Sequence, residues 1–217
     1  MRQIFSLILV FGLLLAAFGV ELSAADEGQT ATKEQPTTGK VREGRAVPSA
    51  KIKKSLKRTP DVIYVPTPQP VVDKMLEMAQ VKEGEVVYDL GCGDGRIVVS
   101  AAKKGAKARG FDINPERIRE SEVNIRENKV GKLASVEHAD IFELDLSGAD
   151  VITLYLLPTL NVKLIPQLEK LKPGARIVSH DFDMRGVKPE KVVEVEAGGR
   201  SHTVYLFKTP LQKDAGE

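Results

Sequence analysis

Short apolar runs alternate with longer amphipathic segments between residues 60 and 210. The apolar runs predict strands at 86–90, 109–113, 135–140, 150–157 and 175–180. The amphipathic segments predict helices at 68–80, 96–104, 115–128 and 162–171, the last interrupted by Pro166. Because strands and helices alternate, we expect parallel strands joined by right-handed crossovers.

Two further apolar stretches close this pattern. Residues 191–196 and 202–208 flank a glycine-containing turn at 197–200, which predicts an antiparallel hairpin. The run at 150–157 is largely apolar, as is typical of a strand buried on both faces. The expected fold class is therefore α/β, with a seven-stranded sheet that is mostly parallel and ends in a C-terminal antiparallel hairpin.

The beginning of the chain has a different character. Arg2 precedes an apolar stretch at 4–20, and small residues at 23–25 suit cleavage. Residues 1–25 are therefore predicted to be a signal peptide or an uncleaved membrane anchor. The expected location is the periplasm or cell exterior, or the inner membrane if the anchor is retained. Positive charge is greater after the stretch than before it, which favours a cytosol-facing domain in an anchored form.

Composition divides the remaining chain. Residues 26–59 are rich in Gly, Thr, Lys, Glu and Pro and predict a flexible linker. Residues 60–210 form the expected folded domain, and residues 211–217 a short tail. The net charge of +2 is too small to favour nucleic acid as a partner.

Metal and disulfide chemistry find little support in the sequence. Cys92 is the single cysteine, so the chain has no internal disulfide. His138, His180 and His202 are scattered along the chain without the spacing of metal ligands. No metal site is predicted.

The strand at 86–90 runs into a glycine-dense turn with the pattern D-x-G-x-G-x-G, formed by Asp89, Gly91, Gly93 and Gly95. These glycines remove the Cβ atoms that would keep a ligand away from the backbone, and they permit dihedrals closed to other residues. The third glycine of a dinucleotide-binding fingerprint is replaced by Arg96. The loop therefore predicts a site for a nucleoside-bearing cofactor of another kind.

Acidic residues stand at the ends of the next two predicted strands. Asp112 follows the glycine loop by about 20 residues, where a carboxylate accepts hydrogen bonds from both ribose hydroxyls. Asp140 is placed to accept from an adenine amino group, and Ile141 to pack on the ring. The ends of three parallel strands are thus expected to converge on one nucleoside.

These residues carry a resemblance. The D-L-G-C-G-D-G-R loop at 89–96 and the acidic Asp112 resemble class I S-adenosylmethionine-dependent methyltransferases, which share a Rossmann-like seven-stranded sheet. Four segments, 64–68, 71–76, 171–180 and 202–206, resemble the small archaeal protein-lysine methyltransferases and their mitochondrial relatives that modify inner-membrane proteins. The likeness spans residues 60 to 208. It implies S-adenosylmethionine as cofactor and a protein lysine as methyl acceptor.

The resemblance also suggests roles for two polar residues. Tyr155 follows the fourth strand, where acceptors enter this fold, and its hydroxyl is placed to orient the amine; the alternative is a packed aromatic with a satisfied hydroxyl. Thr67 is placed to bind the methionine carboxylate, or to cap a helix ahead of Pro68. Base-methylating enzymes carry Asn or Asp followed by Pro-Pro and an aromatic at this point, a pattern that 155–158 lacks. Nucleic acid is disfavoured as substrate.

Two other functions remain open at this stage. One is a methyltransferase of small molecules, which the absence of an extra lid domain disfavours. The other is a non-catalytic module that kept a nucleoside pocket after export. The expected partners are a protein substrate and, through the N-terminus, a membrane.

Overall fold

The computed structural model describes residue 59 and residues 63–214. The predicted leader at 1–25 and almost all of the predicted linker at 26–59 therefore lie outside the described residues. Within the described part, no helix is long and apolar enough to cross a membrane.

The predicted fold class is confirmed by one seven-stranded sheet with the strand order β3-β2-β1-β4-β5-β7-β6. Its strands are β1 (Val86–Leu90), β2 (Lys107–Asp112), β3 (Ala134–His138), β4 (Val151–Leu154), β5 (Arg176–His180), β6 (Lys191–Ala197) and β7 (Arg200–Lys208). The first five strands are parallel, and β7 runs antiparallel to β5 and β6. The strand order reverses between β1 and β4, which is where open α/β sheets form a ligand crevice.

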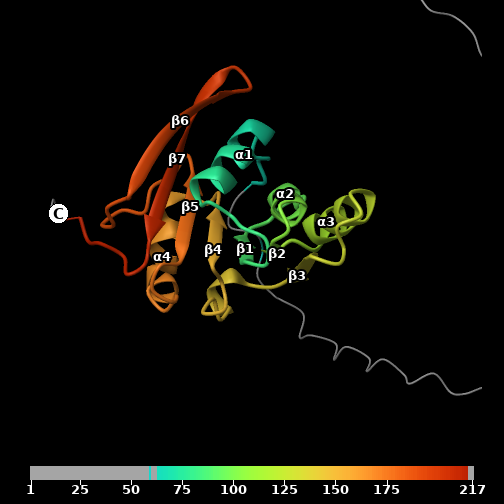
Figure 1. Ribbon diagram of the computed structural model, residues 1–217, viewed down its shortest axis with the longest axis horizontal. Helices are drawn as coiled ribbons and strands as arrows, with labels where there is room; N and C mark the ends of the chain where they lie inside the picture. Colours follow the sequence, from blue (N-terminus) through green and yellow to red (C-terminus); the bar gives the residue numbers. More distant parts are fainter. Residues whose placement is uncertain (1–58, 60–62, 215–217) are drawn as a thin grey trace, which may run out of the picture. The chain divides into compact units, whose positions relative to one another are not determined.

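Helices cover both faces of this sheet (Figure 1). They are α1 (Gln69–Met78), α2 (Arg96–Lys103), α3 (Pro115–Glu127), the short 3-10 helix η1 (Ile141–Glu143) and α4 (Pro158–Leu168). The first three pack on the face that presents Val87, Val151 and Val178. Helix α4 packs on the opposite face, against Ile152 and Ile177. Side chains alternate along each strand, so every central strand contributes to two apolar cores.

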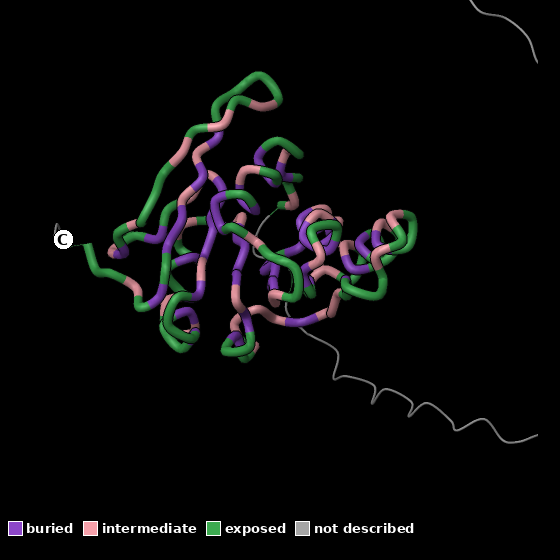
Figure 2. The backbone as a smooth tube through the Cα atoms, in the orientation of Figure 1, coloured by how far each residue is buried: buried purple, intermediate pink, exposed green. Residues whose placement is uncertain are grey.

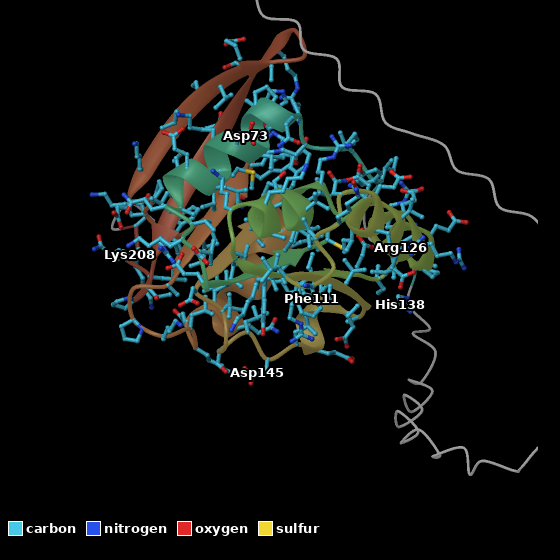
Figure 3. All side chains as sticks on the ribbon, turned by 45° about the vertical axis from the view of Figure 1, so that its right-hand side comes forward. Asp73, Phe111, Arg126, His138, Asp145 and Lys208 are labelled. Carbon is cyan, nitrogen blue, oxygen red and sulfur yellow. The ribbon has the colours of Figure 1, made fainter. Side chains whose placement is uncertain are left out.

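Burial follows the same arrangement. Figure 2 shows the central strands mostly buried, whereas β6 and the β6–β7 turn are largely exposed. Figure 3 shows side chains filling the space between helices and sheet, with Phe111 inside this packing. Arg126, on α3, and Lys208, at the end of β7, lie at opposite ends of the sheet.

Two predicted boundaries are wrong near the end of β4. The strand stops at Leu154 instead of residue 157, and α4 begins at Pro158 instead of residue 162. Leu156 is buried although it belongs to neither element, so its apolar character reflects packing in a loop. Pro158 suits the first helical turn, where its missing N–H has no partner to lose. Pro166 lies inside α4 without ending it.

Candidate active site

A cavity of about 270 Å³ lies at the carboxyl ends of the parallel strands. Its walls come from the segment before α1, the glycine loop, the ends of β2 and β4, and the start of η1. The predicted site residues that border it are Thr67, Asp89, Gly91, Asp112, Asp140, Ile141 and Tyr155. The structure therefore brings together residues that lie almost 90 positions apart in the sequence. The sequence predicted this convergence at the ends of the parallel strands.

The glycine loop is held in place by α3. Ser121 Oγ donates to the carbonyl of Gly93 at 2.7 Å, and Asn124 Nδ2 donates to the carbonyl of Asp94 at 3.1 Å. Gly93 has φ +54° and Gly95 φ +77°, in the left-handed region that favours glycine. Because its carbonyls are already bonded, the loop has its shape before any ligand arrives.

Of the three glycines, Gly91 lines the cavity, and the contact of Gly93 and Gly95 with the cofactor stays a prediction. A Cβ atom on Gly93 would overlap the ring of Tyr64, and one on Gly95 would lie 2.8 Å from Oγ of Ser121. Gly93 thus makes room for the Tyr64 ring, which itself lines the cavity, and Gly95 makes room for α3. Both glycines shape the site through protein packing.

Asp112 ties the loop to the second strand. Its Oδ2 accepts from the backbone N–H of Gly93 at 3.0 Å, and its Oδ1 accepts from the N–H of Asn114 at 2.8 Å. Burial raises the pKa of this carboxyl group. Each carboxylate oxygen has a second lone pair, so ribose hydroxyls can bind without breaking these contacts.

The end of β3 contributes Asp140 and the helix that follows it. Asp140 Oδ1 accepts from the N–H of Phe142 at 3.0 Å and so caps η1, a short element that the sequence did not predict. Ile141 and Phe142 line the cavity from η1. The apolar wall expected for a base is present, formed by a 3-10 turn instead of a strand end.

Asp89 is the most deeply buried acid of the site, 3% exposed. Its Oδ1 accepts from the hydroxyl of Thr153 at 2.7 Å, while its Oδ2 has no hydrogen-bond partner among the described residues. Burial, the largest influence, raises the pKa of Asp89 to about 7. A buried carboxylate oxygen without a partner at a cavity wall is suited to a cationic ligand.

Comparisons with known proteins agree with this geometry. A family model described as the ANTKMT methyltransferase domain matches residues 89–191. A protein-lysine N-methyltransferase of Saccharolobus islandicus is 53% identical over 151 residues, which are 68% of this chain and 94% of the relative. The chain belongs to the class I S-adenosylmethionine-dependent methyltransferases. An adenine nucleotide translocase lysine N-methyltransferase of Mus musculus is 31% identical, with coverage of 61% of this chain and 58% of that protein.

A solved structure supports the same membership. The crystal structure of an RNA methyltransferase from Salinibacter ruber, in complex with S-adenosyl-L-homocysteine, has a TM-score of 0.65 and 46% sequence identity. The alignment covers 70% of this chain and 97% of that one. The methyltransferase described here therefore has the Rossmann-like fold of this group.

The cavity suits the cofactor of the family. S-adenosylmethionine carries two positive charges, a sulfonium and an α-ammonium, and the unpartnered oxygen of Asp89 offers one of them a counter-charge. Asp112 and the η1 wall provide the acceptors and apolar surface that the nucleoside needs. Bound here, the cofactor supplies an already activated methyl group, so the protein mainly aligns donor and acceptor and excludes water.

The pKa of Asp89 predicts pH-dependent cofactor binding. A nearby cation favours the ionised carboxylate, so binding below pH 7 must release a proton, and affinity for S-adenosylmethionine should fall as pH drops, by up to about tenfold per unit. Titration calorimetry between pH 5.5 and 8.5 measures this slope. Asp89→Asn should remove it, and a wild-type affinity that is flat over this range would contradict the assignment.

Tyr155 lines the cavity, but its hydroxyl is already engaged. It donates to Oδ2 of Asp181 at 3.4 Å, and its ring packs on His180 with centroids 3.9 Å apart. Burial, followed by the charge of Asp181, raises the pKa of Tyr155. The hydroxyl therefore stays protonated at neutral pH and acts as a hydrogen-bond donor.

Two of the histidines that are scattered along the sequence lie together in the structure. His180 Nε2 and His202 Nδ1 are 2.8 Å apart, because β5 and β7 pair so that His180 lies opposite Val204. Residues two positions apart on a strand share a face, which brings His202 beside His180. The sequence did not reveal that the strand at 175–180 pairs with the strand at 202–208, because 21 residues separate the two runs. Without that pairing, the contact between the two histidines could not be predicted.

The alternative role of Thr67 as a helix cap is also wrong. The residue preceding α1 is Pro68, and no side-chain cap is present. Instead, Thr67 Oγ1 lies 3.1 Å from His180 Nδ1, while the carbonyl of Thr67 accepts from Arg96 at 2.9 Å. The segment before α1 is thereby fixed across the glycine loop, since Arg96 is the first residue of α2.

Proposed function

We propose that this methyltransferase N-methylates a lysine side chain of a protein substrate. The observation that carries the proposal is the archaeal relative, a protein-lysine N-methyltransferase that is 53% identical and covered over 94% of its length. The mouse relative, whose name gives adenine nucleotide translocase as its substrate, is also a lysine methyltransferase.

The walls of the cavity support an amine acceptor. A lysine must lose a proton before it attacks the methyl group, which at pH 7 costs roughly 4–5 kcal/mol from an unperturbed pKa of about 10.4. Apolar surroundings lower the pKa of an amine, as does a neighbouring sulfonium charge. Leu156, Leu160 and Phe142 line the cavity together with Tyr155 and supply such surroundings.

Labelled methyl transfer tests the proposal. The full-length protein is incubated with S-adenosylmethionine carrying a tritiated methyl group and a lysine-rich protein, and the same protein with its lysines acetylated, so that their nitrogens can no longer attack, serves as control. We expect label on the first and none on the second, with modified lysines located by mass spectrometry. Equal labelling of both proteins would exclude lysine.

A second candidate acceptor rests on the Salinibacter ruber structure, which is that of an RNA methyltransferase. Incubation with a total cell extract decides between the classes of acceptor. Label that is removed by protease supports the proposal, whereas label removed by ribonuclease identifies RNA. Label that passes an ultrafiltration membrane and separates chromatographically from S-adenosylmethionine identifies a small molecule.

Tyr155→Phe measures the contribution of the hydroxyl. The variant keeps the ring that packs on His180 but loses the donor, so a role in orienting the amine predicts about a tenfold lower kcat with unchanged affinity for S-adenosylhomocysteine. Single-turnover rates and calorimetry separate the two. An unchanged kcat would show that the tyrosine acts through packing alone.

We also propose that residues 1–25 direct the chain to or across a membrane, either as a cleaved signal or as an anchor. The apolar stretch at 4–20 and the small residues at 23–25 support this. Mass spectrometry of the mature N-terminus distinguishes cleavage from retention, and protease treatment of intact cells shows on which side the domain lies. A full-length chain in the soluble cytosolic fraction would contradict both forms.

A further inference from the structure

Thr67, His180 and His202 form a hydrogen-bonded chain behind the cofactor cavity. Thr67 Oγ1 lies 3.1 Å from His180 Nδ1, and His180 Nε2 lies 2.8 Å from His202 Nδ1. His202 Nε2 lies 3.2 Å from the carbonyl oxygen of Ala197, at the end of β6. The chain thus joins a wall of the cavity to the C-terminal hairpin.

The carbonyl oxygen of Ala197, at the end of this series of hydrogen bonds, determines which atom donates and which accepts in each of them. A carbonyl oxygen can only accept, so His202 Nε2 must carry a proton and donate to Ala197. In a neutral imidazole the other nitrogen is then an acceptor, so His202 Nδ1 accepts from Nε2–H of His180. His180 Nδ1 is left as an acceptor, and the hydroxyl of Thr67 must donate to it.

Burial favours the neutral form of the His180 ring. His180 is completely buried and His202 is 3% exposed, and burial lowers the pKa of His180 to about 4. The charged groups that face the pair are Asp181, which follows β5, and Arg200, which begins β7. Asp181 Oδ2 lies 3.3 Å from His180 Nε2 and 3.5 Å from His202 Nδ1, but Arg200 already neutralises it at 2.6 Å.

The same contacts argue against a metal ion on this cluster. His180, Asp181 and His202 bring three ligand-type atoms within 4.8 Å of one another. However, the two ring nitrogens that would bind the ion are hydrogen-bonded to each other, and the carboxylate oxygen is taken by Arg200. The cluster is complete as a hydrogen-bonded network.

We propose that His180 and His202 are positioning residues that hold the hydroxyl proton of Thr67 away from the cavity. Thr67 then offers only oxygen lone pairs to the cofactor. It is an acceptor for the α-ammonium of S-adenosylmethionine and not, as its resemblance implied, a donor to the methionine carboxylate. An ammonium has three hydrogen-bond donors and no acceptor. It is therefore complementary to two acceptors on the same cavity, the hydroxyl oxygen of Thr67 and the carboxylate oxygen of Asp89 that has no partner among the described residues.

Ligand analogues test which group Thr67 binds. We compare S-adenosylhomocysteine with one analogue that lacks the carboxylate and one that lacks the α-amino group, by calorimetry on the full-length protein. Thr67→Val should weaken the two amine-bearing ligands about tenfold or more and leave the deaminated analogue within about twofold. Loss of affinity only for ligands with a carboxylate would overturn the proposal. Thr203→Val, whose hydroxyl bonds Glu194 on the hairpin, is the matched control.

Variants of His202 test the hydrogen bonds that link Thr67, His180 and His202. His202→Leu removes the acceptor for His180 Nε2–H, so His180 can take the other tautomer and turn the proton of Thr67 toward the ligand. We expect an amine-specific loss of several-fold. His202→Asn should restore affinity, because its carboxamide oxygen can accept in place of Nδ1. If both variants weaken all ligands equally, the role of His202 is structural and the proposal fails.

Nuclear magnetic resonance of the ring nitrogens gives a readout on the unaltered protein. At pH 7.5 the proposal requires both His180 and His202 to be protonated on Nε2 and unprotonated on Nδ1. A proton on Nδ1 of either ring would overturn it. So would stoichiometric binding of Zn²⁺ that is lost in His202→Leu, since the pair would then be a metal site. None of these tests depends on the identity of the methyl acceptor.

Discussion

Replacing Asp112 by alanine should weaken binding of S-adenosylmethionine by roughly 30- to 1000-fold, or about 2–4 kcal/mol. The carboxylate has two tasks that fail together. It is placed to accept from the ribose hydroxyls, and it already accepts from the N–H groups of Gly93 and Asn114. Its loss therefore removes contacts to the ligand and also frees the glycine loop that borders it.

Calorimetry with S-adenosylhomocysteine measures the affinity, and hydrogen exchange at Gly93 and Asn114 measures the state of the loop. Asp112→Asn keeps one acceptor oxygen and serves as the intermediate case. We expect the alanine variant to show weak binding and faster exchange, with the asparagine variant between it and the wild type. Wild-type affinity in Asp112→Ala would remove this residue from the cofactor site.

Gly95→Ala should lower the free energy of unfolding by about 2–4 kcal/mol, the second large effect. Gly95 has φ +77°, where a side chain costs about 1–2 kcal/mol. Its Cβ would also lie 2.8 Å from Oγ and 3.2 Å from Cα of Ser121, so the packing of α2 on α3 must shift. The defect should appear in the protein without cofactor, because the glycine faces a helix.

A second glycine separates backbone strain from packing. Gly174 has φ +84°, and a Cβ there would meet nothing within 4 Å. Gly174→Ala should therefore cost only the strain, about 1–2 kcal/mol. Urea denaturation of both variants measures the difference. Equal losses would show that the contact of Gly95 with Ser121 contributes nothing.

Much of the cofactor site could be predicted from local sequence. The apolar run before the glycine loop predicted β1 with both boundaries correct, because β-branched residues and a glycine turn mark where the strand begins and ends. The acids at the strand ends were found for a related reason. Parallel strands finish at one edge of the sheet, so Asp89, Asp112 and Asp140 needed no tertiary information to be grouped.

The end of β4 and the start of α4 could not be predicted from local sequence. The hydrophobic side chain of Leu156 predicts that it is buried, and it is buried. A buried residue in a loop and a buried residue in a strand are both hydrophobic, so the sequence does not distinguish them. Strand β4 ends at Leu154 because its pairing with β1 and β5 ends there. Such limits depend on neighbouring strands and not on the segment itself.

Contacts between distant segments were the second gap. The sequence predicted that Gly93 approaches the cofactor, but it gave no sign that this glycine also accommodates the ring of Tyr64, 29 positions earlier. The pairing of His180 with His202 depends likewise on the register of β5 and β7. Periodicity reveals which face a residue occupies, but only the register reveals its neighbour across the sheet.

A crystal structure of the full-length protein with S-adenosylhomocysteine tests the central claim most directly. We predict that the ligand occupies the cavity at the strand ends, with its ribose hydroxyls on Asp112, its adenine beside Ile141 and its α-ammonium near Asp89 and Thr67. Electron density for the ligand elsewhere, or a cavity still closed by its own side chains at saturating ligand, would contradict the account.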